Sequence, residues 1–362
     1  MNFSSVEQRN AIEAEMDWKA RALPKTVFDA LSKVAAEHGA RNAVSFQLQS
    51  GPKDPAETLT WAELLEQTTQ AANLFHSLGI GEEDTIAYLL PNANETVLTL
   101  LGGMTAGIVN PINPLLEVDQ MAALLRETKA KVLVTLKAFP KTDVPQKAAE
   151  AVAKAPNVKT VLEIDLNRYL SPPKSWIVPL VRPKNPVVHK AKVLNFRTEL
   201  DRQNTTLDFD PPAYDRVAAY FHTGGTTGMP KIAQHKFSGM IYNGWLGATL
   251  LFDPESVIMC PLPLFHVFAV EPILMSAIQS GAHVVFPTPA GYRGDGVFDN
   301  FWKLNERWKT TFIIGVPTAF SALMQRPVDA DLSSIKTAFS GSAPLPVELY
   351  KRFEEACGVE VI

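Results

Sequence analysis

The stretch His222–Lys231 reads HTGGTTGMPK and directly follows the apolar run Val217–Phe221, which reads VAAYF. Its three glycines allow a tight turn and leave no Cβ between the backbone and a ligand. Successive backbone N–H groups in such a loop can surround phosphate oxygens, and threonine hydroxyls and a lysine ammonium add further donors. We therefore expect a phosphate site whose contacting residues are Thr223, Gly224, Gly225, Thr226, Thr227, Gly228 and Lys231.

This loop differs from the P-loop of common nucleotide hydrolases and kinases. That motif needs Gly-Lys-Ser/Thr in direct succession. Here Met229 and Pro230 separate Gly228 from Lys231, and Ile232 follows the lysine. A glycine-rich hairpin with an incidental lysine is the plainer alternative, but three Gly, three Thr and Pro-Lys in one short stretch argue against it. A P-loop kinase is a further alternative, and it would transfer the γ-phosphate of ATP and release ADP.

Short β-branched runs alternate with amphipathic helices along the rest of the chain. This rhythm is typical of an α/β protein with two lobes, whose largely parallel sheets are flanked by helices. Thr60 and Glu63 form a capping-box pattern that starts one helix, and Gly79 is placed to end it. Buried strands are predicted at 85–90, 131–135, 283–286 and 311–314, and further helices at 118–128, 296–307, 318–325 and 346–357.

The segment 167–197 differs in composition from its surroundings. It is proline-rich and holds seven Lys or Arg but no Asp or Glu, together with Trp176 and several aliphatic residues. Its prolines exclude a long regular helix. Two interpretations stay open: an ordered surface loop that bridges two lobes, or a basic apolar patch that rests on an anionic membrane. We place the lobe boundary near Leu200, which gives a first lobe at 1–200 and a second at 201–362.

The composition of the chain narrows the classes of function and the cellular location that remain open. The 362 residues carry a formal net charge of -4, which disfavours a general affinity for nucleic acid. Cys260 and Cys357 lie far apart, and no His or Cys spacing suggests a metal site. The uncharged stretch 96–116 contains Gly, Asn and Pro, so a buried helix, a turn and a strand explain it better than a membrane span. With a polar N-terminus, the sequence favours the cytoplasm, with contact to the inner face of a membrane still open.

Three ordered blocks of this sequence resemble the signatures of the adenylate-forming superfamily, which includes acyl-CoA synthetases, aryl-CoA ligases and luciferases. His222–Lys231 is similar to its phosphate-binding signature, Pro261–Phe268 (PLPLFHVF) to its aromatic-His block and Ser340–Pro346 (SGSAPLP) to its adenine-binding block. Weaker echoes occur at Leu89–Glu95 (LLPNANE) and Ala106–Pro114 (AGIVNPINP). The order of the blocks is more specific than any one alone.

The resemblance implies an activity and roles for individual residues. It implies that ATP converts a carboxylic acid to an acyl adenylate, with Mg²⁺ as cofactor, and that coenzyme A then takes the acyl group. Lys231 and His266 would act in catalysis, although a lone His in an apolar block can also be a core residue. No protein ligand to a metal is assigned. The resemblance also implies that the backbone of Gly341, Ser342, Ala343 and Pro344 lies against the face of the adenine.

The resemblance leaves the acid open. The basic 167–197 segment is similar to one in long-chain fatty-acid ligases, so a medium- or long-chain fatty acid is expected, with an aryl or other carboxylate as the alternative. Two further apolar sets border the expected acyl tunnel or simply pack in the core. They are Met240, Trp245, Leu246, Leu250 and Leu251 after the loop, and Val316, Pro317 and Thr318 further on.

The chain also departs from the family pattern. The family usually has Ser at the position of Gly224, often Gly at that of Ile232 and commonly His at that of Phe237, whereas His235 lies two residues earlier. The aromatic-Gly-x-Thr-Glu motif that binds magnesium in the family does not follow the adenine-binding block before Ile362. We therefore expect the N-terminal two thirds of a longer ligase. As a separate polypeptide, it would then be a nucleotide- or acyl-binding module without turnover.

Overall fold

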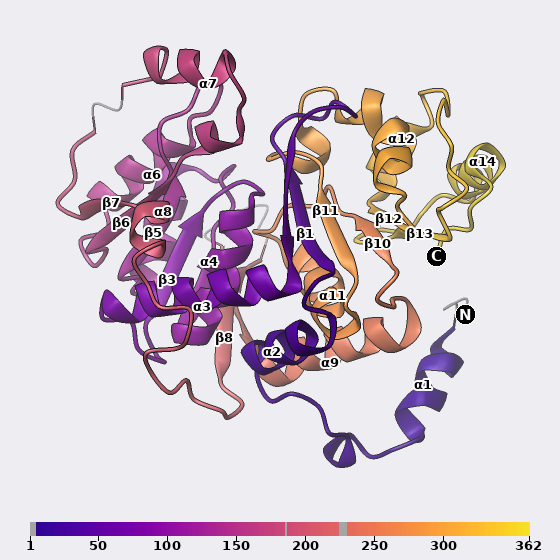
Figure 1. Ribbon diagram of the computed structural model, residues 1–362, viewed down its shortest axis with the longest axis horizontal. Coiled ribbons are helices and arrows are strands. Elements are labelled where there is room, and N and C mark those ends of the chain that lie inside the picture. The colour runs from indigo at the N-terminus through magenta and orange to yellow at the C-terminus, as the bar shows by residue number, and fades with distance from the viewer. Residues whose placement is uncertain (1–4, 185–186, 224–229) are drawn as a thin grey trace.

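The computed structural model describes residues 5–184, 187–223 and 230–362, which form two mostly parallel β-sheets flanked by helices (Figure 1). The α/β class expected from the sequence is confirmed. In chain order the α-helices are α1 Val6–Ala14, α2 Val27–His38, α3 Trp61–Ser77, α4 Asn94–Ala106, α5 Val118–Glu127, α6 Val144–Ala153, α7 Lys174–Ile177, α8 Phe196–Leu200, α9 Phe237–Leu250, α10 Val267–Ala269, α11 Ser276–Ser280, α12 Val297–Trp308, α13 Pro317–Leu323 and α14 Val347–Cys357. A π-helical turn, η4, spans Val270–Met275, and 3-10 turns lie at Trp18–Ala20 (η1), Leu166–Tyr169 (η2), Val178–Leu180 (η3) and Gly291–Arg293 (η5).

The larger sheet has seven strands. Their order across the sheet is β7 (Lys192–Asn195), β6 (Thr160–Ile164), β5 (Val132–Leu136), β3 (Thr85–Leu89), β4 (Ile108–Pro111), β8 (Val217–His222) and β9 (Ile232–Lys236). All neighbours are parallel except β8 and β9, which form an antiparallel hairpin. This hairpin carries the glycine-rich stretch as its connection.

The second sheet has six strands. Their order is β13 (Thr337–Ser340), β12 (Phe312–Gly315), β10 (Val257–Met259), β11 (His283–Phe286), β1 (Asn42–Gln47) and β2 (Ala56–Thr60). Only β1 and β2 are antiparallel. The parallel strands β10, β11 and β12 are short and almost fully buried, which fits continuous β-branched sequences such as His283–Phe286 (HVVF).

The boundary that the sequence suggested near Leu200 does not separate the two sheets. β1 and β2, from the first sixty residues, pair with β11 in the sheet of the C-terminal strands. Conversely, β8 and β9 follow residue 200 but extend the sheet of β3–β7. The local pattern of apolar residues predicts where a strand lies but not its partner, and here the partner of β1 is about 240 residues away in the chain.

Helices α3 and α4 lie between the two sheets (Figure 1); α3 contacts β1 and β2, and α4 contacts strands of both sheets. The two helices approach closely at Gly102, where an added Cβ would lie 2.6 Å from the Cβ of Ala71. One hydrophobic core spans this layer and the inner faces of both sheets. A second core lies beneath α12, α13 and α14 on the other face of the six-stranded sheet and contains Phe301, Trp302 and Phe353.

Several local predictions are confirmed at the level of individual atoms. The Thr60 hydroxyl accepts a hydrogen bond from the backbone N–H of Glu63 at 3.3 Å, and the Glu63 carboxylate accepts one from that of Thr60 at 2.8 Å. Gly79 follows the helix with φ of +80°, a conformation that favours glycine. The uncharged stretch 96–116 is a buried helix followed by a strand, α4 and β4. Among the described residues, no helix has the length and apolar character needed to cross a bilayer.

One buried histidine gives a testable pH dependence. His283 on β11 lies with its Nε2 2.8 Å from the Ser45 hydroxyl, and burial lowers its pKa from 6.5 to about 4. The unfolded chain binds a proton more readily than the fold does. Stability from this residue is therefore present above pH ~6.5 and is lost as the pH falls toward ~4.

We expect the free energy of unfolding to fall by about 3 kcal/mol through this residue over that range. Chemical denaturation at a series of pH values measures it. His283→Gln should flatten the pH dependence between pH ~6.5 and ~4, because glutamine can keep a hydrogen bond to Ser45 but does not titrate. The matched variant His76→Gln, at an exposed histidine, should retain the parent profile. Equal profiles for parent and His283→Gln would contradict the assignment.

Candidate active site

The β8–β9 hairpin holds the two ends of the glycine-rich stretch together. His222 pairs with Ile232, and the next residues continue the clasp, because the backbone N–H of Thr223 donates to the carbonyl of Lys231 at 2.8 Å. Both Thr223 and Lys231 are exposed. Of the expected phosphate contacts, Gly224, Gly225, Thr226, Thr227 and Gly228 lie outside the described residues. The stem nevertheless holds the backbone of Lys231 opposite that of Thr223, where the loop ends.

The other sequence blocks follow the carboxyl ends of parallel strands in both sheets. Asn113 comes after β4 in the seven-stranded sheet, while Pro261–Phe268 follows β10 and Gly341 follows β13 in the six-stranded sheet. Ligands of α/β proteins bind outside the carboxyl ends of such strands. The two sheets therefore contribute loops to one region.

Direct contacts show that these blocks meet. The imidazole Nε2 of His222 accepts a hydrogen bond from the backbone N–H of Asn113 at 3.1 Å. Burial lowers the pKa of His222, and the nearby His266 lowers it further. Since Nε2 accepts, the neutral ring carries its proton on Nδ1, and this buried Nδ1 has no hydrogen-bond partner among the described residues. His222 thus places an unsatisfied donor beside the loop.

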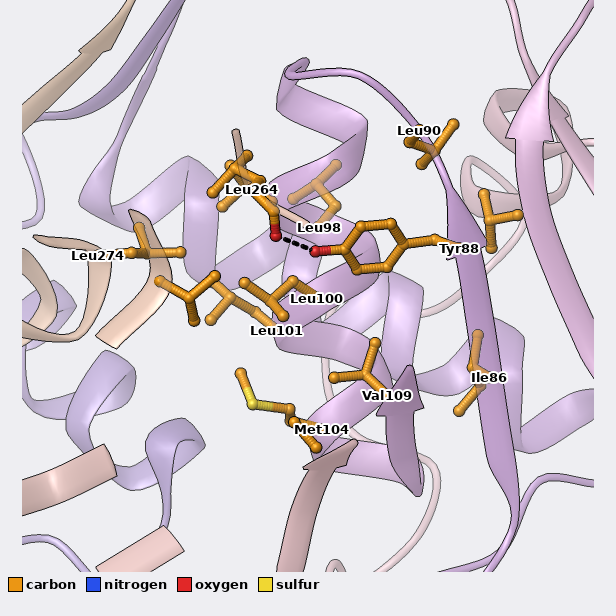
Figure 2. Close-up of a cluster of buried hydrophobic side chains, with 14 of the residues drawn as sticks. Ile86, Tyr88, Leu90, Leu98, Leu100, Leu101, Met104, Val109, Leu264 and Leu274 are labelled. Carbon is orange, nitrogen blue, oxygen red and sulfur yellow. Dashed lines mark hydrogen bonds between the residues drawn. The ribbon is translucent and has the colours of Figure 1, made fainter. Parts of the chain in front are cut away.

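The side chain of Asn92 holds the aromatic-His block in place through two hydrogen bonds to its backbone. This buried side chain donates from Nδ2 to the Leu262 carbonyl at 2.9 Å and accepts at Oδ1 from the Leu264 N–H at 2.8 Å. The Tyr88 hydroxyl on β3 donates to the Leu264 carbonyl, as Figure 2 shows within the surrounding apolar cluster. Two residues at the end of β3 thereby set the position of the segment that presents His266.

His266 caps the N-terminus of α10, where its Nδ1 accepts from the backbone N–H of Phe268 at 3.1 Å. The residue is exposed, yet packing around the imidazole lowers its pKa. Because Nδ1 accepts, the neutral ring bears its proton on Nε2. The imidazole is consequently a neutral donor near His222, and it is not a residue of the core.

The adenine-binding block lies against the aromatic-His block. A Cβ on Gly341 would lie 2.4 Å from the Phe268 ring, so only glycine fits there without a shift. Ser342, Ala343 and Pro344 are exposed, and Ser342 has φ of +69°, an uncommon conformation for a residue other than glycine. A hollow of about 320 Å³ lies beside Ala343 and Pro344, on the side of α14, and is also lined by Tyr350 and by Val361 and Ile362. The block therefore offers accessible backbone and small side chains to a ligand.

The family model of the AMP-binding enzymes matches residues 31–362, a range that includes all three blocks. The chain belongs to the AMP-binding enzyme family. It is 34% identical over 345 residues to a marinolic acid–CoA ligase of Pseudoalteromonas sp., which covers 93% of this chain and 50% of that protein. It is 28% identical over 353 residues to a long-chain-fatty-acid–CoA ligase of Bacillus subtilis, which covers 93% of this chain and 59% of that protein.

Solved structures agree in fold. The anthranilate CoA ligase AuaEII in complex with anthranoyl-AMP has a TM-score of 0.75 at 21% identity, with 96% of this chain and 60% of that chain covered. The N-terminal domain of FACL13 from Mycobacterium tuberculosis has a TM-score of 0.70 at 21% identity, with 93% and 74% covered. The chain spans about half to three fifths of the length of the curated relatives named above.

The sequence did not predict a polar triad of His235, Glu271 and Asn243 at the stem of the β8–β9 hairpin. The His235 Nδ1 on β9 lies 2.5 Å from one oxygen of the buried Glu271, and the other oxygen accepts from the Asn243 side chain at 2.6 Å. Glu271 belongs to the π-helical turn η4, a feature frequent at functional sites. The triad ties the hairpin to the elements that follow His266. The only sequence signal was His235 two residues before the position where the family commonly has His.

The apolar residues expected near the acyl tunnel are mostly core residues. Met240, Trp245 and Leu250 on α9 are buried, and Leu246 and Leu251 are partly buried. The Trp245 ring contacts Trp18 edge-on at 5.5 Å between ring centroids. A second group of the N-terminal arm, the Arg21 guanidinium, lies 4.3 Å from the ring centroid. A role in acyl binding stays a prediction for this set and for Val316, Pro317 and Thr318, which begin α13 with partial or full exposure.

Metal binding is the remaining question at this site. The described residues contain no group of three or more His, Cys, Asp or Glu side chains placed to hold a metal ion. Lys231 and the exposed imidazole of His266 supply a cationic and a neutral donor, which suit phosphate oxygens rather than a cation. The site as described therefore fits the polyphosphate of a nucleotide.

Proposed function

We propose that this chain supplies the nucleotide- and acyl-binding part of an AMP-forming acid–CoA ligase. The proposal rests chiefly on the meeting of the blocks: His222 bonds to Asn113, and Gly341 packs on Phe268, although the chain separates these blocks by about a hundred and about seventy residues. Family membership and the names of the relatives support it.

Formation of the adenylate requires groups that offset negative charge, and it does not require a general base. A carboxylic acid with pKa near ~4.3 is ionised at neutral pH, so its oxygen is already a nucleophile. That oxygen bonds to the α-phosphorus of ATP, the bond to the bridging α–β oxygen breaks, and pyrophosphate leaves. The thiolate of coenzyme A then bonds to the acyl carbon, and AMP leaves. The obstacle is repulsion between the anionic acid and the polyphosphate.

The residues of this chain have separate parts in that scheme. Lys231 provides a positive charge at the end of the loop, and the exposed imidazole of His266, which lies near His222, provides an uncharged donor. The exposed backbone from Gly341 to Pro344 accommodates the adenine. Magnesium, when bound through the phosphate oxygens, would stabilise the negative charge that accumulates on pyrophosphate. Positioning of the acid against the α-phosphate supplies the remainder of the acceleration.

For the acid, we favour a medium- or long-chain fatty acid. The B. subtilis relative acts, by its name, on long-chain fatty acids, and the Pseudoalteromonas relative on marinolic acid. The alternative is an aryl acid, since 4-coumarate–CoA ligases of plants match at 26–28% identity over about 300 residues.

The test is a screen of the full-length protein against carboxylic acids of graded chain length and against aryl acids, with ATP and coenzyme A. We expect AMP and the CoA thioester in equal amounts, with the highest kcat/KM for a fatty acid. A preference for aryl acids would overturn the substrate assignment alone. Release of ADP would overturn the proposed reaction.

A second candidate function follows from the extent of the match, because the chain covers 50% and 59% of the lengths of the two relatives. The 362-residue chain alone would then bind ATP or acid without turnover. An ATP–pyrophosphate exchange assay on this chain distinguishes the two, because exchange needs only formation of the adenylate. ATP binding without exchange supports the binding module, and exchange by this chain alone refutes it.

A further inference from the structure

The tip of the 167–197 segment exposes a group of large apolar side chains. α7 and η3 form consecutive helical turns at the periphery of the molecule, at the top of the view in Figure 1. Within six residues, Trp176 is 70% exposed, Ile177 50%, Leu180 84% and Val181 56%. Only Val178 of this run is buried. Contiguous exposed apolar side chains of this size mark an interaction site rather than an ordinary surface.

The residues on either side of this tip are anchored to the body of the protein. The Arg168 guanidinium pairs with Glu57 and with the buried Glu95, and the Tyr169 hydroxyl donates to Glu95 at 2.6 Å. On the other side, Arg182 pairs with Asp165 at 2.6 Å and donates to a backbone carbonyl. Docking would therefore cost little ordering of the chain.

The charged residues of the segment itself all have one sign. No Asp or Glu occurs from Leu166 to Thr198. The arginines of this segment are used in ion pairs, but Lys184, Lys190 and Lys192 are exposed and have no carboxylate partner among the described residues. Lysines are depleted in protein–protein interfaces, whereas lysines beside exposed Trp and aliphatic residues are typical of surfaces that bind anionic lipid.

From these observations we propose that the tip Trp176–Val181 and the lysines Lys184, Lys190 and Lys192 form a docking surface for an anionic lipid bilayer. The apolar side chains enter the boundary between headgroups and acyl chains, and the lysines lie against the negatively charged headgroups. The chain rests on the surface and does not span the bilayer. This arrangement is independent of the proposed ligase activity, because it uses none of the residues of the candidate site.

The test is sedimentation of the protein with vesicles of phosphatidylcholine containing one quarter phosphatidylglycerol, compared with pure phosphatidylcholine. We expect binding to the anionic vesicles that weakens about tenfold or more on the neutral ones and in high salt. Trp176→Ser/Leu180→Ser and Lys184→Glu/Lys190→Glu should each lower the partition coefficient by about tenfold or more.

Matched variants change equally exposed residues elsewhere. Val6→Ser/Val347→Ser and Lys33→Glu/Lys351→Glu should bind as the parent does, and equal thermal unfolding shows that each variant is folded. As a second measurement, brominated lipids should quench the fluorescence of Trp176, and Trp176→Phe should remove that quenching. Absence of vesicle binding by the parent would overturn the proposal, and so would equal binding by the tip variants and their controls. Loss of self-association in the tip variants, with no vesicle binding, would instead assign the surface to a second copy of the chain.

Discussion

Lys231→Ala should lower the rate of acyl-adenylate formation by about 10²–10³-fold in the full-length protein, the size of effect seen when one preorganised group that stabilises transition-state charge is removed. The side chain extends from an exposed position at the end of the loop, and only its backbone carbonyl holds the hairpin clasp with Thr223. Removing the ammonium therefore removes positive charge without opening the stem. The affinity for ATP should fall as well.

The control is Lys236→Ala. This exposed lysine is the last residue of β9, the strand that begins directly after Lys231, and its loss should leave adenylate formation unchanged. Lys231→Arg keeps the charge but alters its geometry, so an intermediate rate is expected. Stopped-flow measurement of pyrophosphate release gives the rate, and calorimetric titration gives the affinity. Parent-like values for Lys231→Ala in both would remove the role assigned to this residue.

Asn92→Ala should lower the free energy of unfolding by about 2–4 kcal/mol. The side chain satisfies two buried backbone groups at once, the Leu262 carbonyl and the Leu264 N–H, and alanine leaves both without a partner. The variant should also lower kcat/KM, because the same two bonds position the segment that carries His266.

The matched variant is Asn300→Ala, whose side chain is partly exposed and donates to the Gly296 carbonyl at the start of its own helix at 3.1 Å, with a longer contact of 3.5 Å to the Ser50 hydroxyl. That change should alter the free energy of unfolding by less than about 1 kcal/mol. Urea denaturation compares the two. A loss below about 1 kcal/mol for Asn92→Ala would mean that the aromatic-His block is held in place by other contacts.

The features that the sequence predicted correctly depend on residues close together in the chain. The capping box of Thr60 and Glu63 and the buried run His283–Phe286 each need only a few neighbours, and both appear in the structure as expected. The three motif blocks were found in the same way, because each is a short pattern of residue types.

The features that the sequence did not predict depend on distant partners. No local pattern shows that β1 pairs with β11, or that Asn92 bonds to Leu262 and Leu264 about 170 residues later. The 167–197 segment gives a related lesson. Its arginines contribute to the net positive charge that the sequence shows, but the structure uses Arg168 and Arg182 in ion pairs, so the lysines are left to meet a partner.

The most direct test of adenylation follows one oxygen atom. The acid is supplied with ¹⁸O in its carboxylate, together with ATP and coenzyme A, and the full-length protein turns it over. If the carboxylate attacks the α-phosphorus, the AMP released on thioester formation carries one ¹⁸O per molecule, which mass spectrometry detects. Unlabelled AMP, or ¹⁸O found in inorganic phosphate with ADP as the other product, would contradict the account.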